Sequence, residues 1–203
     1  MNQLNKKKQQ IQRKSSVPRR SVSETQNLIL DAAEEIVLEL GGRELKLDLA
    51  AKVAKLSKGG VLYHFPTKAK LIEAMLARLL KRYDSELQAM SRDDSATERL
   101  SSYIRSSFHT GKRDKRMSAA LLAVIAEDKT LLEPLRDFYK QRFGELRKTE
   151  LNFNNAAIAM LAVEGLFFLD LLELSYLKKK ERNSLEKKLL LLINSKSNVC
   201  EID

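Results

Sequence analysis

The chain has 203 residues, and 37 basic against 27 acidic side chains leave a formal charge of +10. This length is sufficient for an apolar core. Seven glycines, three prolines and no tryptophan are too few turn-forming residues for an all-β protein, and the abundance of Leu, Ala, Lys and Glu is typical of helical bundles. A single cysteine, Cys200, excludes a disulfide scaffold and fits a reducing compartment. We therefore expect an all-α, cytoplasmic protein.

The positive charge is concentrated in two segments. Residues 1–20 carry seven basic side chains and no acidic one, with too few apolar residues to form a core, so we expect a disordered tail. It is either a solvated tail or an arm that follows phosphates or enters a minor groove. Residues 43–70 hold seven bases against Glu44 and Asp48. A basic block of this kind attracts anions.

The first strong pattern is a wide apolar stripe at helical spacing, which predicts a helix over 24–40. Ser23 and Gln26 have the spacing of a capping box at its start. Gly41 and Gly42 end it, because glycine readily adopts the backbone conformation that follows a helix.

Two short helices are predicted next, at about 47–54 and 58–64. Ser57 can cap the second of them. Pro66 prevents a smooth continuation, and Thr67 can cap a fourth, longer amphipathic helix. Two short helices joined by a tight turn and held between longer ones are typical of a helix-turn-helix.

The rest of the chain predicts five further helices, about nine in all. They are expected after the caps Asp93–Ser95, at about 116–127 behind a polar loop, at about 130–150, from Asn154 or Asn155 to about Leu177, and at about 184–194.

The helix that ends near Leu177 is apolar on all sides. Between Ala156 and Leu174 it carries only three acidic residues. Acidic residues inside a membrane span are costly, and a helix that is apolar all round is typically buried. We therefore expect this helix to pack against its own core and a second subunit, and we expect no membrane association.

The segment Ser57-Lys58-Gly59-Gly60-Val61-Leu62-Tyr63-His64-Phe65-Pro66-Thr67-Lys68 resembles the helix-turn-helix signature of the TetR family of bacterial transcriptional regulators. The resemblance covers residues 24–83 well, and beyond them only the helical character and the length agree. It implies an N-terminal three-helix helix-turn-helix domain at 21–84, with the helix-turn-helix itself at about 46–65. A C-terminal helical bundle at 85–203 would bind a ligand and form a dimer.

The residues of this segment suit a helix placed end-on in a major groove. Lys58 can reach guanine acceptors or a phosphate. Gly59 and Gly60 each cost about 1 kcal/mol relative to alanine, which indicates that another backbone must approach closely. Together with the resemblance, these properties give the candidate DNA-contact residues: Lys46, Lys58, Gly59, Gly60, Leu62, Tyr63, His64 and Lys68.

Three positions depart from the family pattern. Lys46 stands where Thr or Ser usually caps a helix and contacts phosphate. Lys55 replaces the usual glycine of the turn, where a left-handed conformation would cost about 1 kcal/mol. Leu62 replaces the usual tyrosine and could read a thymine methyl group. Two contact residues have a second interpretation, because Tyr63 is equally a core residue and His64 could cap the end of its helix.

The sequence is compatible with three classes of function to different degrees. The first is a homodimeric repressor that reads a pseudo-palindrome of double-stranded DNA with two recognition helices about 34–36 Å apart, and that a small apolar or cationic effector releases. The second is a constitutive or protein-responsive DNA-binding adaptor, whose interior would lack a cavity of about 300 Å³. The third is an enzyme, for which we find no catalytic set, phosphate-binding glycine loop, cofactor motif or metal-ligand spacing.

The resemblance also suggests residues for the ligand pocket and the dimer interface. Each pocket residue could equally belong to the core. The pocket candidates are Tyr103, Phe108, Met117, Leu121, Ile125 and Phe138, and the interface candidates are Leu166, Phe167, Leu185 and Leu189.

Overall fold

A computed structural model of the chain describes residues 20–109, 111–126 and 128–195. These residues form nine α-helices, two short 3₁₀ turns and no strand, which confirms the all-α prediction. The predicted disordered tail lies outside them, except for Arg20. The elements are α2 (Val22–Leu40), η1 (Gly42–Glu44), α3 (Leu47–Val53), α4 (Lys58–His64), α5 (Lys68–Met90), α6 (Ala96–Phe108), α7 (Lys112–Ile125), η2 (Lys129–Leu132), α8 (Glu133–Leu146), α9 (Phe153–Leu171) and α10 (Lys179–Asn194).

Helix α2 begins two residues before its predicted start. Its capping box is formed by Ser21 and Glu24: the Ser21 Oγ accepts the Glu24 N–H at 3.1 Å, and the Glu24 carboxylate accepts the Ser21 N–H at 2.7 Å. The predicted pair of Ser23 and Gln26 was therefore wrong. A carboxylate is favoured over an amide here, because it also interacts with the positive end of the helix dipole.

The helix-turn-helix forms at the predicted place. Lys46 precedes α3 without a side-chain capping bond, as expected for a lysine at that position. Lys55 in the turn has the left-handed φ of 55° that the family glycine would adopt easily. The Ser57 Oγ caps α4 by accepting the Gly60 N–H at 3.1 Å. Val61, on the inner face of α4, is fully buried.

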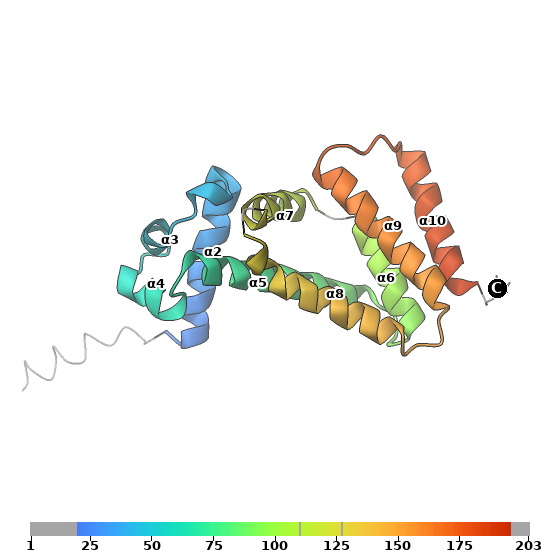
Figure 1. Cartoon of the computed structure of the whole chain (residues 1–203), viewed down its shortest axis with the longest axis horizontal. Helices are drawn as coiled ribbons and strands as arrows, with labels where there is room; N and C mark the ends of the chain where they lie inside the picture. The colour runs from blue at the N-terminus through green and yellow to red at the C-terminus, as the bar shows by residue number, and fades with distance from the viewer. Residues whose placement is uncertain (1–19, 110, 127, 196–203) are drawn as a thin grey trace, which may run out of the picture.

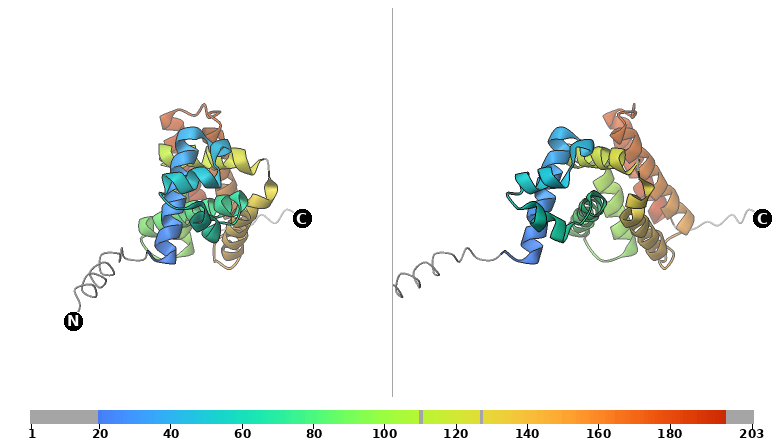
Figure 2. Two further views of the ribbon diagram at one scale, coloured as in Figure 1. Left: turned by 90° about the vertical axis from the view of Figure 1, so that its left-hand side faces the viewer. Right: turned by 60° about the vertical axis from the view of Figure 1, so that its left-hand side comes forward.

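One apolar cluster joins the helix-turn-helix to the rest of the protein. It includes residues of α2, α3, α4 and the first half of α5, and also Leu121 and Ile125 of α7. Gly42 in η1 lies directly against α7: a Cβ there would stand 2.3 Å from the Val124 Cγ2 and 2.9 Å from the Ala120 carbonyl oxygen. Figures 1 and 2 show α7 lying beside α2. This packing requires glycine at position 42.

A second apolar cluster holds together α6, α9 and α10, with Leu87 of α5 and Leu146 of α8. Figure 1 places α9 and α10 at the end of the molecule opposite to α3 and α4. Helix α5 runs without a break through the expected domain boundary at residue 84. The division into two domains at residue 84 therefore stays a prediction, and the helices on its two sides share packing.

Several predicted helix boundaries in the C-terminal half were wrong. Helix α10 begins at Lys179 rather than at about 184, and α8 ends at Leu146 rather than at about 150. Helix α7 begins at Lys112, in a stretch interpreted as a polar loop, because Lys115 and Arg116 make contacts with other helices. Helix α9 ends at Leu171 rather than near Leu177. It is long and apolar enough to cross a membrane by length and composition alone, but it packs against α6, α7, α8 and α10.

Candidate DNA-binding surface and internal cavity

The surface of α4 presents a large aromatic side chain to solvent. Tyr63 is 78% exposed, so its interpretation as a core residue was wrong. Its ring meets the ring of His64 edge-on, with 5.0 Å between the centroids. Val61 and Phe65, on the opposite side of α4, are buried in the first cluster. The helix is therefore held by one face and displays the other.

The glycines of α4 have no packing role in the described protein. No atom lies within 4 Å of a Cβ placed on Gly59, and a Cβ on Gly60 would meet only the Ser57 Oγ, at 3.3 Å. Glycine destabilises a helix by about 1 kcal/mol relative to alanine. No contact among the described residues requires glycine at position 59, so nothing inside the chain accounts for this loss of stability. The space above Gly59 is available for close approach by another molecule.

The lysines around α4 are already paired with neighbouring groups. The Lys58 Nζ lies 2.9 Å from the Asp48 carboxylate on α3, and both side chains are largely exposed. The Lys46 Nζ lies 3.7 Å from Glu44. Exposed ion pairs contribute about 0–1 kcal/mol, so a phosphate could replace either carboxylate easily. The sequence pattern did not indicate Asp48, because its role depends on the packing of α3 against α4.

Lys68 differs from the other candidate contacts. Its Nζ donates to the carbonyl oxygens of Gly42 at 3.4 Å and Arg43 at 3.5 Å. These bonds tie the start of α5 to the η1 turn. Lys68 therefore holds the position of η1, whereas Lys58 and Tyr63 extend from α4 into solvent.

An internal cavity of about 290 Å³ lies between α5, α6, α7, α8 and α9. Leu121, Ile125 and Phe138 line it, as predicted. Tyr103 and Met117 do not line it and belong only to the apolar clusters, whereas Leu121 and Ile125 both join a cluster and reach the cavity. Phe108 instead borders a separate polar hollow. The other residues around this hollow are Lys115, Asp170, Glu173, Ser175 and Arg182.

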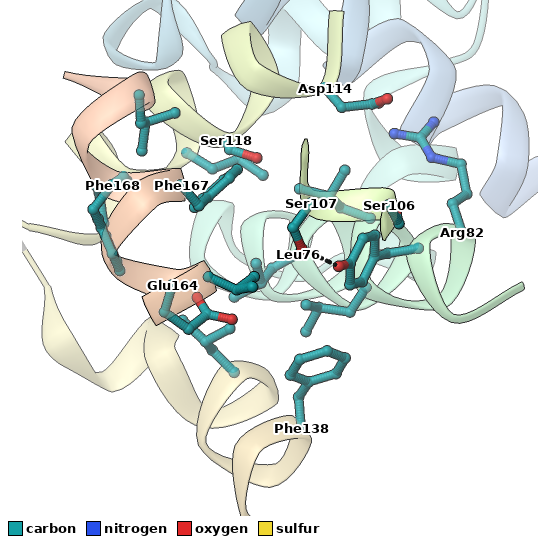
Figure 3. Close-up of a pocket in the computed structure, with 18 of the residues that line it drawn as sticks. Leu76, Arg82, Ser106, Ser107, Asp114, Ser118, Phe138, Glu164, Phe167 and Phe168 are labelled. Carbon is teal, nitrogen blue, oxygen red and sulfur yellow. Dashed lines mark hydrogen bonds between the residues drawn. The ribbon is translucent and has the colours of Figure 1, made fainter. Parts of the chain in front are cut away.

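The cavity wall is mainly apolar and aromatic. Figure 3 shows Phe138 rising from α8 and Phe167 from α9, with the Glu164 carboxylate near them. Tyr83 lies on the α5 side and shares a hydrogen bond with Ser107, with 3.1 Å between the two hydroxyl oxygens. An apolar cavity with a few convergent polar groups is the usual form of a small-molecule site. The described residues contain no group of three or more His, Cys, Asp or Glu side chains placed to hold a metal.

Glu164 is the partly buried carboxylate of this cavity. One oxygen accepts the Tyr103 hydroxyl and the other accepts the Tyr139 hydroxyl at 2.5 Å. Burial raises the pKa of Glu164 to about 7 and that of Tyr139 to about 12, because it disfavours the charged form of each. The sequence showed Glu164 only as one acid in an apolar helix, and nothing there indicated that it lines a cavity.

The cavity is joined to α2 by an ion-pair network around one buried carboxylate. Glu34 of α2 is 3% exposed. Its carboxylate lies 3.0 Å from Arg82, 3.6 Å from Arg78 and 3.9 Å from Arg113. Arg82 also lines the cavity. In addition, Arg116 of α7 donates to the Leu38 carbonyl oxygen at 2.6 Å. Helices α5 and α7 are therefore both linked to α2 by direct polar contacts.

The predicted interface residues on α9 and α10 face the interior of the protomer. Leu166 and Leu189 are buried, Leu185 packs against the second cluster, and Phe167 lines the cavity. Leu166 and Leu189 are thus taken up by the core of the protomer, whereas Phe167 and Leu185 are only partly buried and stay predictions, because a helix that is apolar all round gives no sequence signal of which side is inside. The exposed apolar residues of the two helices include Ile158, Leu161, Leu169, Leu172 and Leu191, between 44% and 67% exposed.

Comparison with known proteins agrees with this architecture. The family description "Bacterial regulatory proteins, tetR family" matches residues 29–75, and "Tetracyclin repressor-like, C-terminal domain" matches residues 97–194. The HTH-type transcriptional regulator RutR of Escherichia coli K12 is 33% identical over 86 residues, which is 42% of this chain and 41% of RutR. The chain thus matches less than half the length of this relative.

Solved structures share the fold along most of the chain. A member of the TetR family from Streptomyces coelicolor A3 has a TM-score of 0.67 and 21% identity, and the match covers 85% of this chain and 99% of that one. The multidrug binding protein EbrR, crystallised with ethidium, has a TM-score of 0.63 and 20% identity, with 85% of this chain and 100% of EbrR covered.

An N-terminal helix-turn-helix joined to an all-helical body defines a class of transcription regulators. The family matches fall on both parts of the chain, and the α4 segment carries the family signature. The chain belongs to the TetR family.

Proposed function

We propose that this protein is a homodimeric, sequence-specific DNA-binding repressor that a small molecule releases from its operator. The observation that carries the proposal is the exposed start of α4. Gly59 has open space above its Cα, and Lys58 lies beside it in an easily replaced ion pair. Glycines give α4 a low intrinsic helix propensity but leave space for the DNA backbone, and Lys58 supplies a hydrogen-bond donor. These properties suit a helix that enters the major groove.

In this proposal the residues of α4 have separate roles. Lys58 leaves Asp48 and donates to guanine acceptors or to a phosphate. Leu62 makes apolar contact with a base, while Tyr63 and His64 donate to phosphates at the groove edge. The Gly60 N–H stays with the Ser57 cap, so Gly60 contributes close approach rather than a donor.

Two further lysines border the proposed DNA surface. Lys46, 71% exposed in its side chain, reaches a neighbouring phosphate. Lys68 acts indirectly, because it holds the η1 turn through two carbonyl oxygens. A lysine that contacts only phosphate strengthens binding to every sequence equally, so neither residue sets the operator sequence.

The homodimer would form through the exposed apolar stripe of α9. Ile158, Leu161, Leu169 and Leu172 recur at helical spacing, and Gly165 between them has nothing within 4 Å of a Cβ position. A glycine in such a stripe allows a partner helix to approach closely. Two-fold pairing would place two copies of α4 on successive turns of the same DNA face, about 34–36 Å apart.

The cavity favours the effector-controlled repressor over the constitutive adaptor. Its volume of about 290 Å³ is close to the lower end of typical ligand sites, roughly 300 Å³. The structurally similar EbrR has been crystallised with ethidium. An effector would release DNA by binding better to a state in which α7 and α5 have moved α2. In this proposal the protein acts in the bacterial cytoplasm, where it binds the nucleoid, and it has no catalytic role.

The test is a selection of binding duplexes from a random pool, followed by footprinting on the best sequence. We expect enrichment of a pseudo-palindrome and a protected region with two half-sites. An enriched but asymmetric, single half-site would contradict the dimeric repressor. No enrichment over the starting pool would contradict sequence-specific binding itself.

A further inference from the structure

We propose that the cavity takes a lipophilic organic cation, with its positive charge beside Glu164 and its rings among the aromatic side chains. This inference rests on the proposed function, since it names the chemical class of the effector. It makes Glu164 the residue that selects for charge. Figure 3 shows the Glu164 carboxylate and the Phe138 and Phe167 rings directed into the same space.

The Glu164 carboxylate is held in place for this role. The hydroxyls of Tyr103 and Tyr139 donate to its two oxygens. A carboxylate offers about four lone-pair positions, so two remain for a ligand. Because the tyrosines come from α6 and α8, the carboxylate is anchored on both sides of α9 and need not reorganise when a ligand binds.

The charges that line the cavity favour a cation over an anion. Glu86, Asp114 and Glu164 are acidic. The basic lining residues are Arg82, which is 3.0 Å from Glu34, and a 69% exposed histidine, His109. An anionic ligand would have to remove Arg82 from a buried carboxylate, and breaking such a pair leaves a buried charge uncompensated.

The aromatic wall already accommodates a cation. The Arg142 guanidinium lies over the ring of Phe138, 4.4 Å from its centroid, and over the ring of Tyr103 at 4.9 Å. Arg142 is ion-paired with Asp84 and lies outside the cavity lining. Phe167 and Phe168 present further rings to the cavity, and a cation over an aromatic face is stabilised when water is excluded.

Binding of a cation is expected to release a proton. Burial raises the pKa of Glu164 to about 7, and a cation beside the carboxylate would lower that pKa again. The ionisable groups around it are Tyr103 of α6 and Tyr139 of α8, which donate to the carboxylate, and Tyr83 of α5, whose pKa is raised by burial and also by the Glu164 charge. Arg142 of α8 lies over the Tyr103 ring.

The helices α7 and α10, which also pack against α9, direct their nearest charges elsewhere. Lys115 of α7 and Arg182 of α10 both pair with Asp170, further along α9. Asp114 of α7 lines the cavity some way from Glu164, as Figure 3 shows. Glu164 is therefore the carboxyl of the cavity expected to titrate with ligand binding near neutral pH.

The experiment measures fluorescence titrations of the full chain without DNA. The probes are ethidium, a permanent cation, and Nile red, a neutral dye. With a Glu164 pKa of about 7, roughly 90% of the carboxyl is protonated at about pH 6 and roughly 10% at about pH 8. Ethidium affinity should therefore rise about tenfold over this range, and Nile red affinity should stay constant.

Two variants and a control separate charge recognition from packing. Glu164→Gln keeps the shape and should remove the pH dependence and weaken ethidium binding at about pH 8 by at least tenfold. Tyr139→Phe removes one donor to the carboxylate, so it should shift the pH profile upwards. Glu150→Gln, which removes an exposed carboxyl outside the cavity lining, should keep the tenfold pH effect, because solvent screens its charge.

Two results would overturn the inference: ethidium binding as tight to Glu164→Gln as to the wild type, or no ethidium binding up to millimolar concentration. Either result leaves the DNA-binding proposal intact if the selected operator is still bound. Conversely, Glu164-dependent ethidium binding by a protein that enriches no duplex would support the cation site and contradict the repressor.

Discussion

Replacing the buried carboxyl of the cavity by an amide should stabilise the protein in a pH-dependent way. In Glu164→Gln the amide oxygen can accept the Tyr103 hydroxyl and the amide N–H₂ can donate to the Tyr139 oxygen, so both contacts persist. The pKa of Glu164 rises from the ordinary 4.5 to about 7 on folding. At roughly 1.4 kcal/mol per tenfold change, this rise corresponds to about 3 kcal/mol.

The direction follows from which state holds the proton. Below the unfolded pKa of 4.5 the carboxyl of Glu164 is neutral in both states, so the wild type loses nothing. Between about pH 4.5 and about pH 7 the unfolded chain ionises at Glu164 while the folded protein keeps the carboxyl neutral, so the free energy of unfolding of the wild type falls as the pH rises. Above about pH 7 the folded protein carries the charge, and the loss is complete. The free-energy advantage of Glu164→Gln should therefore grow by about 3 kcal/mol between about pH 4.5 and about pH 8.

Urea unfolding followed by far-ultraviolet circular dichroism gives this difference by linear extrapolation. Both proteins are compared at one protomer concentration, because dimerisation makes stability depend on concentration. A Glu86→Gln variant, which removes an exposed carboxyl of the same cavity, should show no such growth. A difference between Glu164→Gln and wild type that stays constant with pH would refute the assignment of a raised pKa to Glu164.

Three other substitutions probe the remaining parts of the account. Gly59→Ala should raise thermal stability by about 0.4–1 kcal/mol, yet weaken operator binding, and a variant that binds as well as wild type would show that no close approach occurs there. Gly42→Ala should destabilise by about 1–3 kcal/mol in urea melts, because its Cβ would overlap Val124 and the Ala120 carbonyl; unchanged stability would disprove the tight contact. Leu161→Glu should yield monomers in light scattering, and a persistent dimer would exclude the α9 stripe.

The elements that local patterns predicted best are those whose boundaries are set by neighbouring residues. Ser57 and Thr67 cap α4 and α5 as expected, since a capping side chain bonds a backbone N–H only three residues away. The start of α2 was missed because two overlapping pairs had the same spacing, and only the Ser21–Glu24 pair is reciprocal. The start of α7 was missed because its charged first turn forms contacts that lie far away in sequence.

The candidate functional residues follow the same division. The α4 surface could be predicted, because its residues lie in one continuous, recognisable segment. The cavity could be predicted only in part, because the choice between Tyr103 in the core and Phe138 at the cavity wall depends on where five helices leave space. Which side of α9 is free for a partner could not be predicted: both Leu166 and Leu161 are leucine, and only the packing makes one buried and the other 63% exposed.

The central claim is that α4 reads duplex DNA. Its most direct test is fluorescence anisotropy with the selected duplex and a scrambled duplex of the same length, at several salt concentrations, for wild type and Lys58→Ala. We expect the wild type to prefer the selected duplex throughout, and Lys58→Ala to lose about 1–3 kcal/mol of that preference if Lys58 reads a base. Equal affinity of the wild type for both duplexes, even at low salt, would contradict the account.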